Sequence, residues 1–470
     1  MDGNNQVSVF LVGKTNDCNF STIQEALDNV EENSVIQVKP GIYNEHLSFT
    51  KKVHLIGCKE SIKDKSSTEL PIVVLDSDKS CEIDVPVKIE GIVFTHKKDL
   101  QFDSILSFIK TSLNFEDKEQ EEFRSLLLIN SESDFNNIAI LCSEENGITF
   151  SGIKSSFTNS FIHHTAVAGI YVTRDAKPTI NNCMITDSNS VGIRIDDSAS
   201  PKIEYCKIEK SAGMGVCASG NANPTIICCT INDCAFGICI IESSIGTYKN
   251  CDIHHNKIGF NIDIDNQISP QISKNIIHNN EAIGIVTKAN SNARINDCEI
   301  FANGIGVMID ESSTLEIIRC EIYKNNDNGI ISISNVMMQY CEIYDQPLGI
   351  ILQGSSNGFF GRCLIHDCKD ICVLIDSHTT TVIEDCVICK SGIGIYLKKG
   401  KLEISGSDIY QNTDFGINIA TDRMGSYEYC NIHDNGTGIF GTSSQKPNFD
   451  TCNVCNNSKG NISFLQDMFK

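Results

Sequence analysis

The stretch Cys298-Glu-Ile300-Phe-Ala-Asn303-Gly-Ile-Gly306-Val-Met-Ile309 decides the fold, because the chain repeats it with small changes. The next copy reads Cys320-Glu-Ile322-Tyr-Lys-Asn325-Asn-Asp-Asn-Gly329-Ile-Ile. Copies follow one another at steps of 21 to 24 residues, which indicates a solenoid whose repeats contact their neighbours. The first positions of the copies are Ser160, Cys183, Cys206, Cys229, Cys251, Asn275, Cys298, Cys320, Cys341, Cys363, Cys386, Ser407, Cys430 and Cys452.

Apolar and polar residues alternate within each copy, which is the period of a β-strand and not of a helix. Such short strands cannot bury a core alone. Stacking each coil on the next, about 4.8 Å away, pairs their backbones and makes a continuous core. Because connections between parallel strands wind right-handed, the sequence predicts an all-β fold, a right-handed parallel β-helix with about 22–23 residues per coil.

Two more positions of the repeat keep one residue type. A glycine recurs where Gly306 and Gly329 stand, which predicts either a positive φ or a close backbone approach. An asparagine recurs at a second corner, where stacked amides can satisfy the turn backbone and one another. The asparagines of this row are Asn256, Asn280, Asn303, Asn325, Asn412, Asn435 and Asn457.

The regular repeat covers residues 147–460. Residues 1–60 are predicted to form an N-terminal cap and the first strands, with a helix that begins at the capping box Ser21–Gln24 and closes the first coil. We expect irregular early coils over 61–146, with an acidic insertion at 97–124. We expect a C-terminal cap over 461–470.

Composition limits the classes of function. The formal net charge of −22 argues against a nucleic-acid partner or an anionic membrane surface, and no stretch is long enough to span a membrane. No secretory signal is recognisable, so a cytoplasmic or nuclear location is expected. Most of the 23 cysteines share one repeat position and are predicted to be reduced, buried side chains. Neither a cofactor nor a metal site is expected.

The N-terminal segment resembles a known family. The order Phe20–Leu27, Val35–Glu45 and Val53–Gly57 is similar to the first segment of pectin-lyase-like β-helices. Pectin methylesterases carry a similar Gly-x-Tyr-x-Glu segment, here Gly41-Ile-Tyr43-Asn-Glu45. The coils are most similar to the β-helix domain of F-box-only substrate adaptors of ubiquitin ligases, although no F-box is recognisable. The resemblance implies the fold and, for function, substrate recognition in a ubiquitin-ligase-like setting.

The catalytic motifs of the enzymes with this fold are not matched. Pectin methylesterases use a tryptophan, and the chain has none. Polygalacturonases carry Asn-Thr-Asp before Asp-Asp, whereas here Asp196-Asp197 precedes Asn412-Thr-Asp414. No catalytic residue is therefore assigned.

An acidic ridge follows the strand that contains the recurrent glycine. If Glu242 and Asp263 stacked on adjacent coils, about 5 Å apart, they would suit a retaining glycosidase or a calcium ion. Carboxylates that cap turns are the plainer alternative. The ridge consists of Asp196, Glu242, Asp263, Asp310 and Asp376.

A second row lies three residues after each first position. Its alternation with the core isoleucines predicts that it points outward, where aromatic and histidine side chains suit contact with a protein or carbohydrate, or stacking between coils alone. The candidate binding residues are His254, His278, Phe301, Tyr323, Tyr344, His366, Tyr410 and His433.

These observations favour a non-catalytic intracellular scaffold that presents a long surface to protein partners. The alternative is a carbohydrate-active enzyme or carbohydrate-binding protein that uses the acidic ridge.

Overall fold

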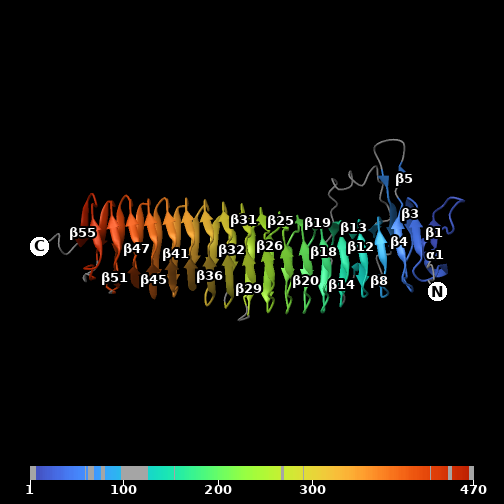
Figure 1. The fold of residues 1–470 in the computed structure, drawn as a ribbon, viewed down its shortest axis with the longest axis horizontal. Helices are drawn as coiled ribbons and strands as arrows, with labels where there is room; N and C mark the ends of the chain where they lie inside the picture. The colour runs from blue at the N-terminus through green and yellow to red at the C-terminus, as the bar shows by residue number, and fades with distance from the viewer. Residues whose placement is uncertain are drawn as a thin grey trace, which may run out of the picture. The chain divides into compact units, whose positions relative to one another are not determined.

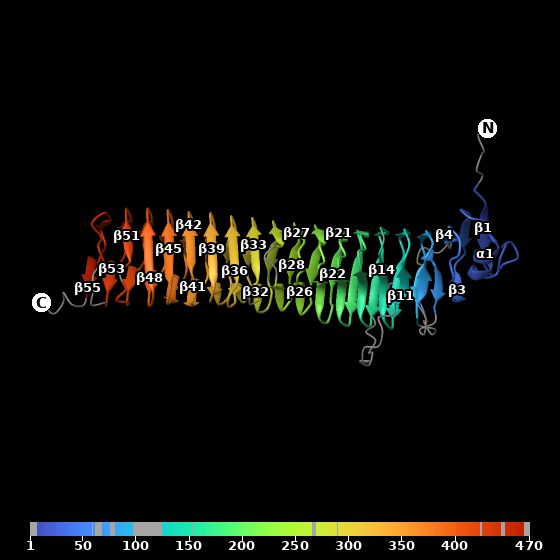
Figure 2. The same ribbon diagram turned by 90° about the horizontal axis from the view of Figure 1, so that it is seen from below.

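The computed structural model describes residues 7–58, 60–61, 68–75, 80–96, 125–152, 154–265, 269–288, 290–423, 425–442 and 447–464. The predicted acidic insertion at 97–124 lies outside the described residues, as do residues 465–470 of the predicted C-terminal cap. The chain divides into two compact units, Met1–Ala235 (unit 1) and Phe236–Lys470 (unit 2). In each unit, strands from successive coils lie side by side (Figures 1 and 2).

Unit 1 winds through three parallel sheets, and a short antiparallel pair, β5 (Glu60–Ser61) and β6 (Thr68–Glu69), stands apart. Sheet 1 contains β1 (Val9–Val12), β2 (Val35–Val38), β4 (His54–Gly57), β9 (Lys88–Glu90), β12 (Asp134–Asn136), β15 (Ser156–Thr158), β18 (Thr179–Asn181), β21 (Lys202–Glu204) and β24 (Thr225–Ile227). Sheet 2 contains β3 (Gly41–Asn44), β7 (Pro71–Val74), β10 (Val93–Thr95), β13 (Ala139–Ser143), β16 (Phe161–Thr165), β19 (Met184–Ser188), β22 (Lys207–Glu209) and β25 (Thr230–Asn232). Sheet 3 contains β8 (Cys81–Ile83), β11 (Ser125–Ile129), β14 (Asn146–Ser151), β17 (Ala168–Thr173), β20 (Val191–Ile195) and β23 (Met214–Ala218).

Unit 2 repeats the same three-sheet winding. Sheet 1 contains β27 (Thr247–Lys249), β30 (Gln271–Ser273), β33 (Asn292–Asn296), β36 (Thr314–Ile318), β39 (Asn335–Gln339), β42 (Gly358–Gly361), β45 (Thr380–Glu384), β48 (Lys401–Ser405) and β51 (Ser426–Glu428). Sheet 2 contains β28 (Asp252–His254), β31 (Ile276–His278), β34 (Glu299–Phe301), β37 (Glu321–Tyr323), β40 (Glu342–Tyr344), β43 (Leu364–His366), β46 (Val387–Cys389), β49 (Asp408–Tyr410), β52 (Asn431–His433) and β54 (Asn453–Cys455). Sheet 3 contains β26 (Phe236–Glu242), β29 (Ile258–Ile264), β32 (Ile283–Thr287), β35 (Ile305–Ile309), β38 (Asn328–Ser332), β41 (Leu348–Gly354), β44 (Ile371–Ser377), β47 (Ile393–Leu397), β50 (Phe415–Ile419), β53 (Thr437–Gly441) and β55 (Gly460–Phe464).

The predicted register of the repeat is confirmed. Ile277, Ile300 and Ile322 are paired across β31, β34 and β37, and all three side chains are fully buried. The cysteines at the first position are buried beside them. Cys320 Sγ, for example, donates to the carbonyl of Ile318, 3.4 Å away. Each coil therefore contributes a short apolar strand to one core, as the alternation predicts, and the all-β parallel β-helix is confirmed.

The predicted N-terminal helix is α1 (Ile23–Asn29), and its N-cap is Thr22 and not Ser21. Thr22 Oγ1 accepts from the Glu25 amide at 3.2 Å, and the Glu25 carboxylate accepts from the amide of Ser21, the residue before the N-cap, at 3.1 Å. The helix start is therefore held by Thr22 and Glu25, and not by the predicted pair Ser21 and Gln24. The helix buries Ile23, Ala26 and Leu27. That it closes the end of the first coil stays a prediction.

Two corners explain the recurrent glycine and asparagine. Gly306 needs no positive φ; a Cβ there would lie 2.6 Å from the carbonyl oxygen of Gly329, so the close approach of adjacent coils excludes a side chain. At the other corner, Asn280 Nδ2 donates to Asn303 Oδ1 at 2.9 Å, and Asn303 Nδ2 donates to Asn325 Oδ1 at 3.2 Å. The predicted amide ladder is thus confirmed in unit 2.

Candidate functional site

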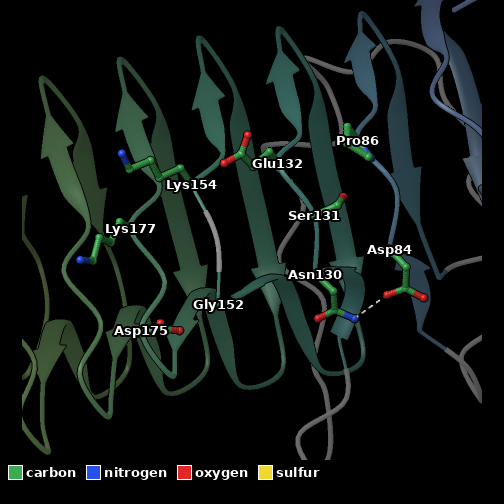
Figure 3. A pocket seen from close by; sticks show the side chains of 9 residues that line it. All are labelled: Asp84, Pro86, Asn130, Ser131, Glu132, Gly152, Lys154, Asp175 and Lys177. Atoms are coloured by element: carbon green, nitrogen blue, oxygen red, sulfur yellow. Dashed lines mark hydrogen bonds between the residues drawn. The ribbon is translucent and has the colours of Figure 1, made fainter.

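Unit 1 carries an open groove of about 690 Å³, here called the unit-1 groove. It follows the ends of four consecutive strands of sheet 3, namely β8, β11, β14 and β17. Each coil contributes a loop that turns from sheet 3 toward sheet 1 (Figure 3). The lining residues are Asp84, Pro86, Asn130, Ser131, Glu132, Gly152, Lys154, Asp175 and Lys177.

Most of the charged groups in the groove are unpaired. Asp84 Oδ1 accepts from Asn130 Nδ2 at 2.8 Å, as Figure 3 shows. The other four charged residues are all exposed, and within the described residues their side chains form no hydrogen bond or ion pair. They are Glu132, Lys154, Asp175 and Lys177. The groove therefore presents two ammonium groups and several carboxylate oxygens to solvent.

Neighbouring charges on the same unit are used internally. Asp196 lies beyond the groove, at the end of β20, where Arg194 Nε is 2.7 Å from its Oδ2 and the Ser219 hydroxyl donates to its Oδ1. Lys202 and Lys207 are paired with Glu204 and Glu209, at 2.8 and 2.5 Å. The unpaired lysines of the groove are thus distinct from the lysines of the next coils.

The acidic ridge is not brought together as predicted. The register of β26 and β29 places Glu242 opposite Ile264, and Asp263 opposite Ile241, so the two carboxylates are not stacked partners. The reason is that Glu242 lies five residues after Gly237, whereas Asp263 lies four after Gly259. The proposed pairing of Glu242 with Asp263 was therefore wrong.

The remaining ridge residues of unit 2 have local partners. The amide of Glu311 donates to Asp310 Oδ1 at 2.9 Å, which is the turn-capping arrangement. Lys398 and Lys399 each place Nζ 2.8 Å from an oxygen of Asp376, and these hydrogen bonds lower the pKa of the Asp376 carboxyl. The ridge residues described here serve turns and ion pairs.

The outward row of unit 2 forms a continuous ring stack. Successive ring centroids lie 4.9 to 5.2 Å apart, and from His278 onward the ring planes differ by only 5 to 10°. All six rings are half-buried. Cys389 interrupts the row, after which Tyr410 and His433 stack at 5.3 Å. The stack consists of His254, His278, Phe301, Tyr323, Tyr344 and His366.

Carboxylates flank the ring stack. Partial burial, with the like charges of Glu299 and Glu342, raises the pKa of the Glu321 carboxyl. The histidines are held by such groups: His366 Nε2 is 3.0 Å from Glu342, and His366 Nδ1 is 2.5 Å from Asp367. In unit 1 the same row differs from the expectation of an exposed stripe, because His163, Thr186, Glu209 and Asn232 are buried.

Sequence reasoning missed the unit-1 groove. Its charged residues stand in loops outside the repeated strands, where the alignment of coils was not searched for a site. The available signal was a pair of lysines, Lys154 and Lys177, at the same loop of adjacent coils in an acidic chain.

Two general features bear on the kind of site. Across the described ranges, no group of three or more His, Cys, Asp and Glu side chains is arranged to hold a metal ion. No helix in the part of the chain that the structure describes has the length and apolar character needed to cross a membrane.

Comparison with solved structures finds carbohydrate-active enzymes. A periplasmic alginate epimerase matches with 13% identity over 70% of this chain and 78% of its own, at a TM-score of 0.38. The pectin methylesterase of Erwinia chrysanthemi matches with 16% identity over 51% of this chain and 80% of its own, at a TM-score of 0.31. An α-1,3-glucanase of Streptomyces thermodiastaticus matches with 11% identity over 79% of this chain and 61% of its own, at a TM-score of 0.34. A search of curated proteins finds no match to this sequence.

These findings correct the leading interpretation. A non-catalytic protein-interaction scaffold in a ubiquitin-ligase-like setting is contradicted, because the matching structures are an epimerase, a methylesterase and a glucanase. The similarity to F-box-only adaptors is not shown.

The family itself is shown by a sequence model. The model described as "Right handed beta helix region" matches residues 115–210, 168–307 and 285–424, which together cover more than half of the chain. These segments contain the repeated strands and corners described above. The chain therefore belongs to the right-handed parallel β-helix family.

Proposed function

We propose that this protein binds an acidic oligosaccharide in the unit-1 groove. The observation that carries the proposal is the set of four exposed, unpaired charges, Glu132, Lys154, Asp175 and Lys177, that line one open groove across consecutive coils. A volume of about 690 Å³ is within the range of ligand sites, about 300–1,000 Å³. The openness of the groove suits a chain-like ligand that enters from the side.

The spacing of the coils supports a linear polymer. Adjacent coils lie about 4.8 Å apart, so equivalent loops recur at close to the length of one pyranose residue. A sugar chain lying along the groove would meet one loop with each residue. A rigid β-helix holds these loops in place before binding, which reduces the entropy lost when the complex forms.

The charges support an acidic sugar. Lys154 and Lys177 stand on adjacent coils, so each can pair with the carboxylate of one uronic acid residue. Sugar hydroxyls can donate to the carboxylates of Glu132 and Asp175. Because these groups are exposed, salt should weaken the ion pairs and leave the hydroxyl contacts in place.

Two earlier expectations remain proposals beside this one. The burial of Ile23, Ala26 and Leu27 supports α1 as the N-terminal cap of the β-helix. A cytoplasmic or nuclear location stays a prediction that fractionation of cells with a specific antibody would test.

Calorimetric titration with a short oligouronate, and with the same oligosaccharide after reduction of its carboxyl groups, tests the proposal. The oligouronate should bind and the reduced form should bind about tenfold more weakly or worse, since the lysine contacts are lost. Lys154→Ala with Lys177→Ala should weaken oligouronate binding similarly.

The matched control is Lys202→Ala with Lys207→Ala, which removes two lysines of the same unit that are already paired with glutamates. This control should leave the affinity unchanged. Equal binding of the two oligosaccharides, or an equal loss in both variants, would overturn the proposal.

A further inference from the structure

We propose that unit 2 carries a second, separate subsite that binds one acidic sugar residue; this inference rests on the proposed function. The subsite is a pocket of about 320 Å³, here called the unit-2 pocket. Its walls come from the turns that follow β37, β40 and β43, three adjacent coils of sheet 2. The residues used below are Lys324, Asp345, Gln346, Pro347, Asp367 and Lys369.

The residues of the ring stack directly precede three lining residues of the pocket in the chain. Lys324, Asp345 and Asp367 directly follow Tyr323, Tyr344 and His366 in the chain. These rings are stacked at 4.9 and 5.2 Å with interplanar angles of 6 and 8°. Since the next residue in the row is the small, buried Cys389, the stack ends at the coil that closes the pocket.

The backbone fixes where the charged side chains begin. Lys324, Asp345 and Asp367 have φ values of 53, 54 and 51°, so each occupies the left-handed region at the same corner of its coil. The amide of Lys324 donates to the carbonyl of Asp345 at 3.0 Å. The three turns therefore present their side chains in one repeated geometry.

The floor of the pocket is already satisfied. Asn325 Nδ2 donates to Gln346 Oε1 at 3.1 Å, and Gln346 Nε2 donates to the carbonyl of Ile322 at 3.4 Å. Pro347 has no amide hydrogen to offer. A ligand in this pocket would consequently be held by the charged side chains above the floor.

Three of those charged groups are available. In the described part of the chain, Lys324, Asp345 and Lys369 have no side-chain hydrogen bond or ion pair, and Lys324 Nζ lies 5.9 Å from the centre of the Tyr323 ring. Asp367 is occupied by His366 Nδ1 at 2.5 Å. Two ammonium groups and one carboxylate that form no ion pair therefore line the pocket.

This donor set matches the chemistry of the unit-1 groove on a smaller scale. The two lysines can bind a uronate carboxylate, and Asp345 can accept from a sugar hydroxyl. A volume of about 320 Å³ is near the lower limit of ligand sites, about 300 Å³, and favours one sugar residue over a chain.

Titration of the full-length protein with the same oligouronate tests this inference. Two sites per chain are expected. In a Lys154→Ala/Lys177→Ala background one site should remain, and adding Lys324→Ala with Lys369→Ala should weaken that residual binding by about tenfold or more.

The matched control adds Lys390→Ala with Lys257→Ala to that background. Lys390 and Lys257 hold the repeat positions of Lys324 and Lys369 on other coils, so residual binding should persist. If no binding remains in the background variant, or if the two additions act alike, the unit-2 pocket is not a site and the unit-1 proposal stands. If instead the background variant binds as the unaltered protein does and only Lys324→Ala/Lys369→Ala reduces binding, the unit-1 proposal fails and the unit-2 pocket remains.

Discussion

The unit-1 groove and the ring stack of unit 2 are built from the same kind of coil, but they use their polar side chains differently. In the stack, rings pack on rings and histidines bind carboxylates, as His366 does with Glu342 and Asp367. In the groove, Lys154 and Lys177 have no such partner among the described residues. The comparison shows that a β-helix holds equivalent side chains of successive coils in fixed rows. Rows whose side chains already bind one another are not available to a ligand, whereas rows with unpaired charges are.

The largest expected effect is a loss of stability when the apolar core of the β-helix, which both regions share, is changed. Ile300→Asp places an unpaired charge among fully buried isoleucines of adjacent coils. Such a change costs several kcal/mol, on the order of 3–5 kcal/mol or more. Thermal unfolding followed by circular dichroism should show a large fall in Tm. An unchanged Tm would mean that this side chain does not face the core.

Breaking the amide ladder should cause the second-largest loss in the free energy of unfolding. Asn303→Ala removes the acceptor for Asn280 and the donor to Asn325 and the Ile277 carbonyl, and leaves buried polar groups without partners. The expected loss is about 2–4 kcal/mol. Urea unfolding would measure it. Asn279→Ala, at an exposed position one residue before the ladder, should lose much less.

The ring stack should stabilise the fold without contributing to ligand binding in the unit-1 groove. Tyr323→Ala with Tyr344→Ala removes two stacked, half-buried rings and should cost about 1–3 kcal/mol. Oligouronate binding that depends on Lys154 and Lys177 should stay the same in calorimetry. Loss of that binding in a folded double variant would erase the distinction between the two regions.

The smallest effect concerns pH. The hydrogen bond to Asp434 raises the pKa of His433 above its ordinary value of 6.5, and Asp408 adds to the shift. Since a raised pKa stabilises the folded state through the protonated form, this contribution is fully present below pH 6.5 and is lost as the pH rises through the raised pKa.

For these partly exposed groups the effect should be below about 1 kcal/mol. The stability of unaltered protein and of His433→Gln, measured by urea unfolding across this range, should converge as the pH rises. Parallel curves would contradict the assignment.

The rows could be read from the sequence because they repeat. Cys298, Ile300 and Phe301 recur in step with their neighbours, so spacing alone predicted which side chains meet on adjacent coils. The predicted pairing of Glu242 with Asp263 failed because Glu242 stands five residues after its glycine and Asp263 only four after its own, so the uninterrupted strand register places them at different positions.

The groove could not be predicted, since its residues belong to loops. Lys154 and Asp175 are candidate ligand-binding residues because they line the same groove and because their side chains have no partner among the described residues. Neither property can be recognised from the repeat pattern of the sequence. In the same way, the close approach that requires Gly306 depends on the carbonyl of Gly329 on the next coil.

Hydrogen–deuterium exchange with and without a short oligouronate tests the central claim most directly, because it locates the ligand on the chain. In the Lys324→Ala/Lys369→Ala protein, we predict slower exchange in peptides that cover residues 130–132 and 175–177, the loops of the unit-1 groove. The carboxyl-reduced oligosaccharide should give much less protection. Protection confined to other loops, or none at a concentration that saturates binding, would contradict the assignment of the groove.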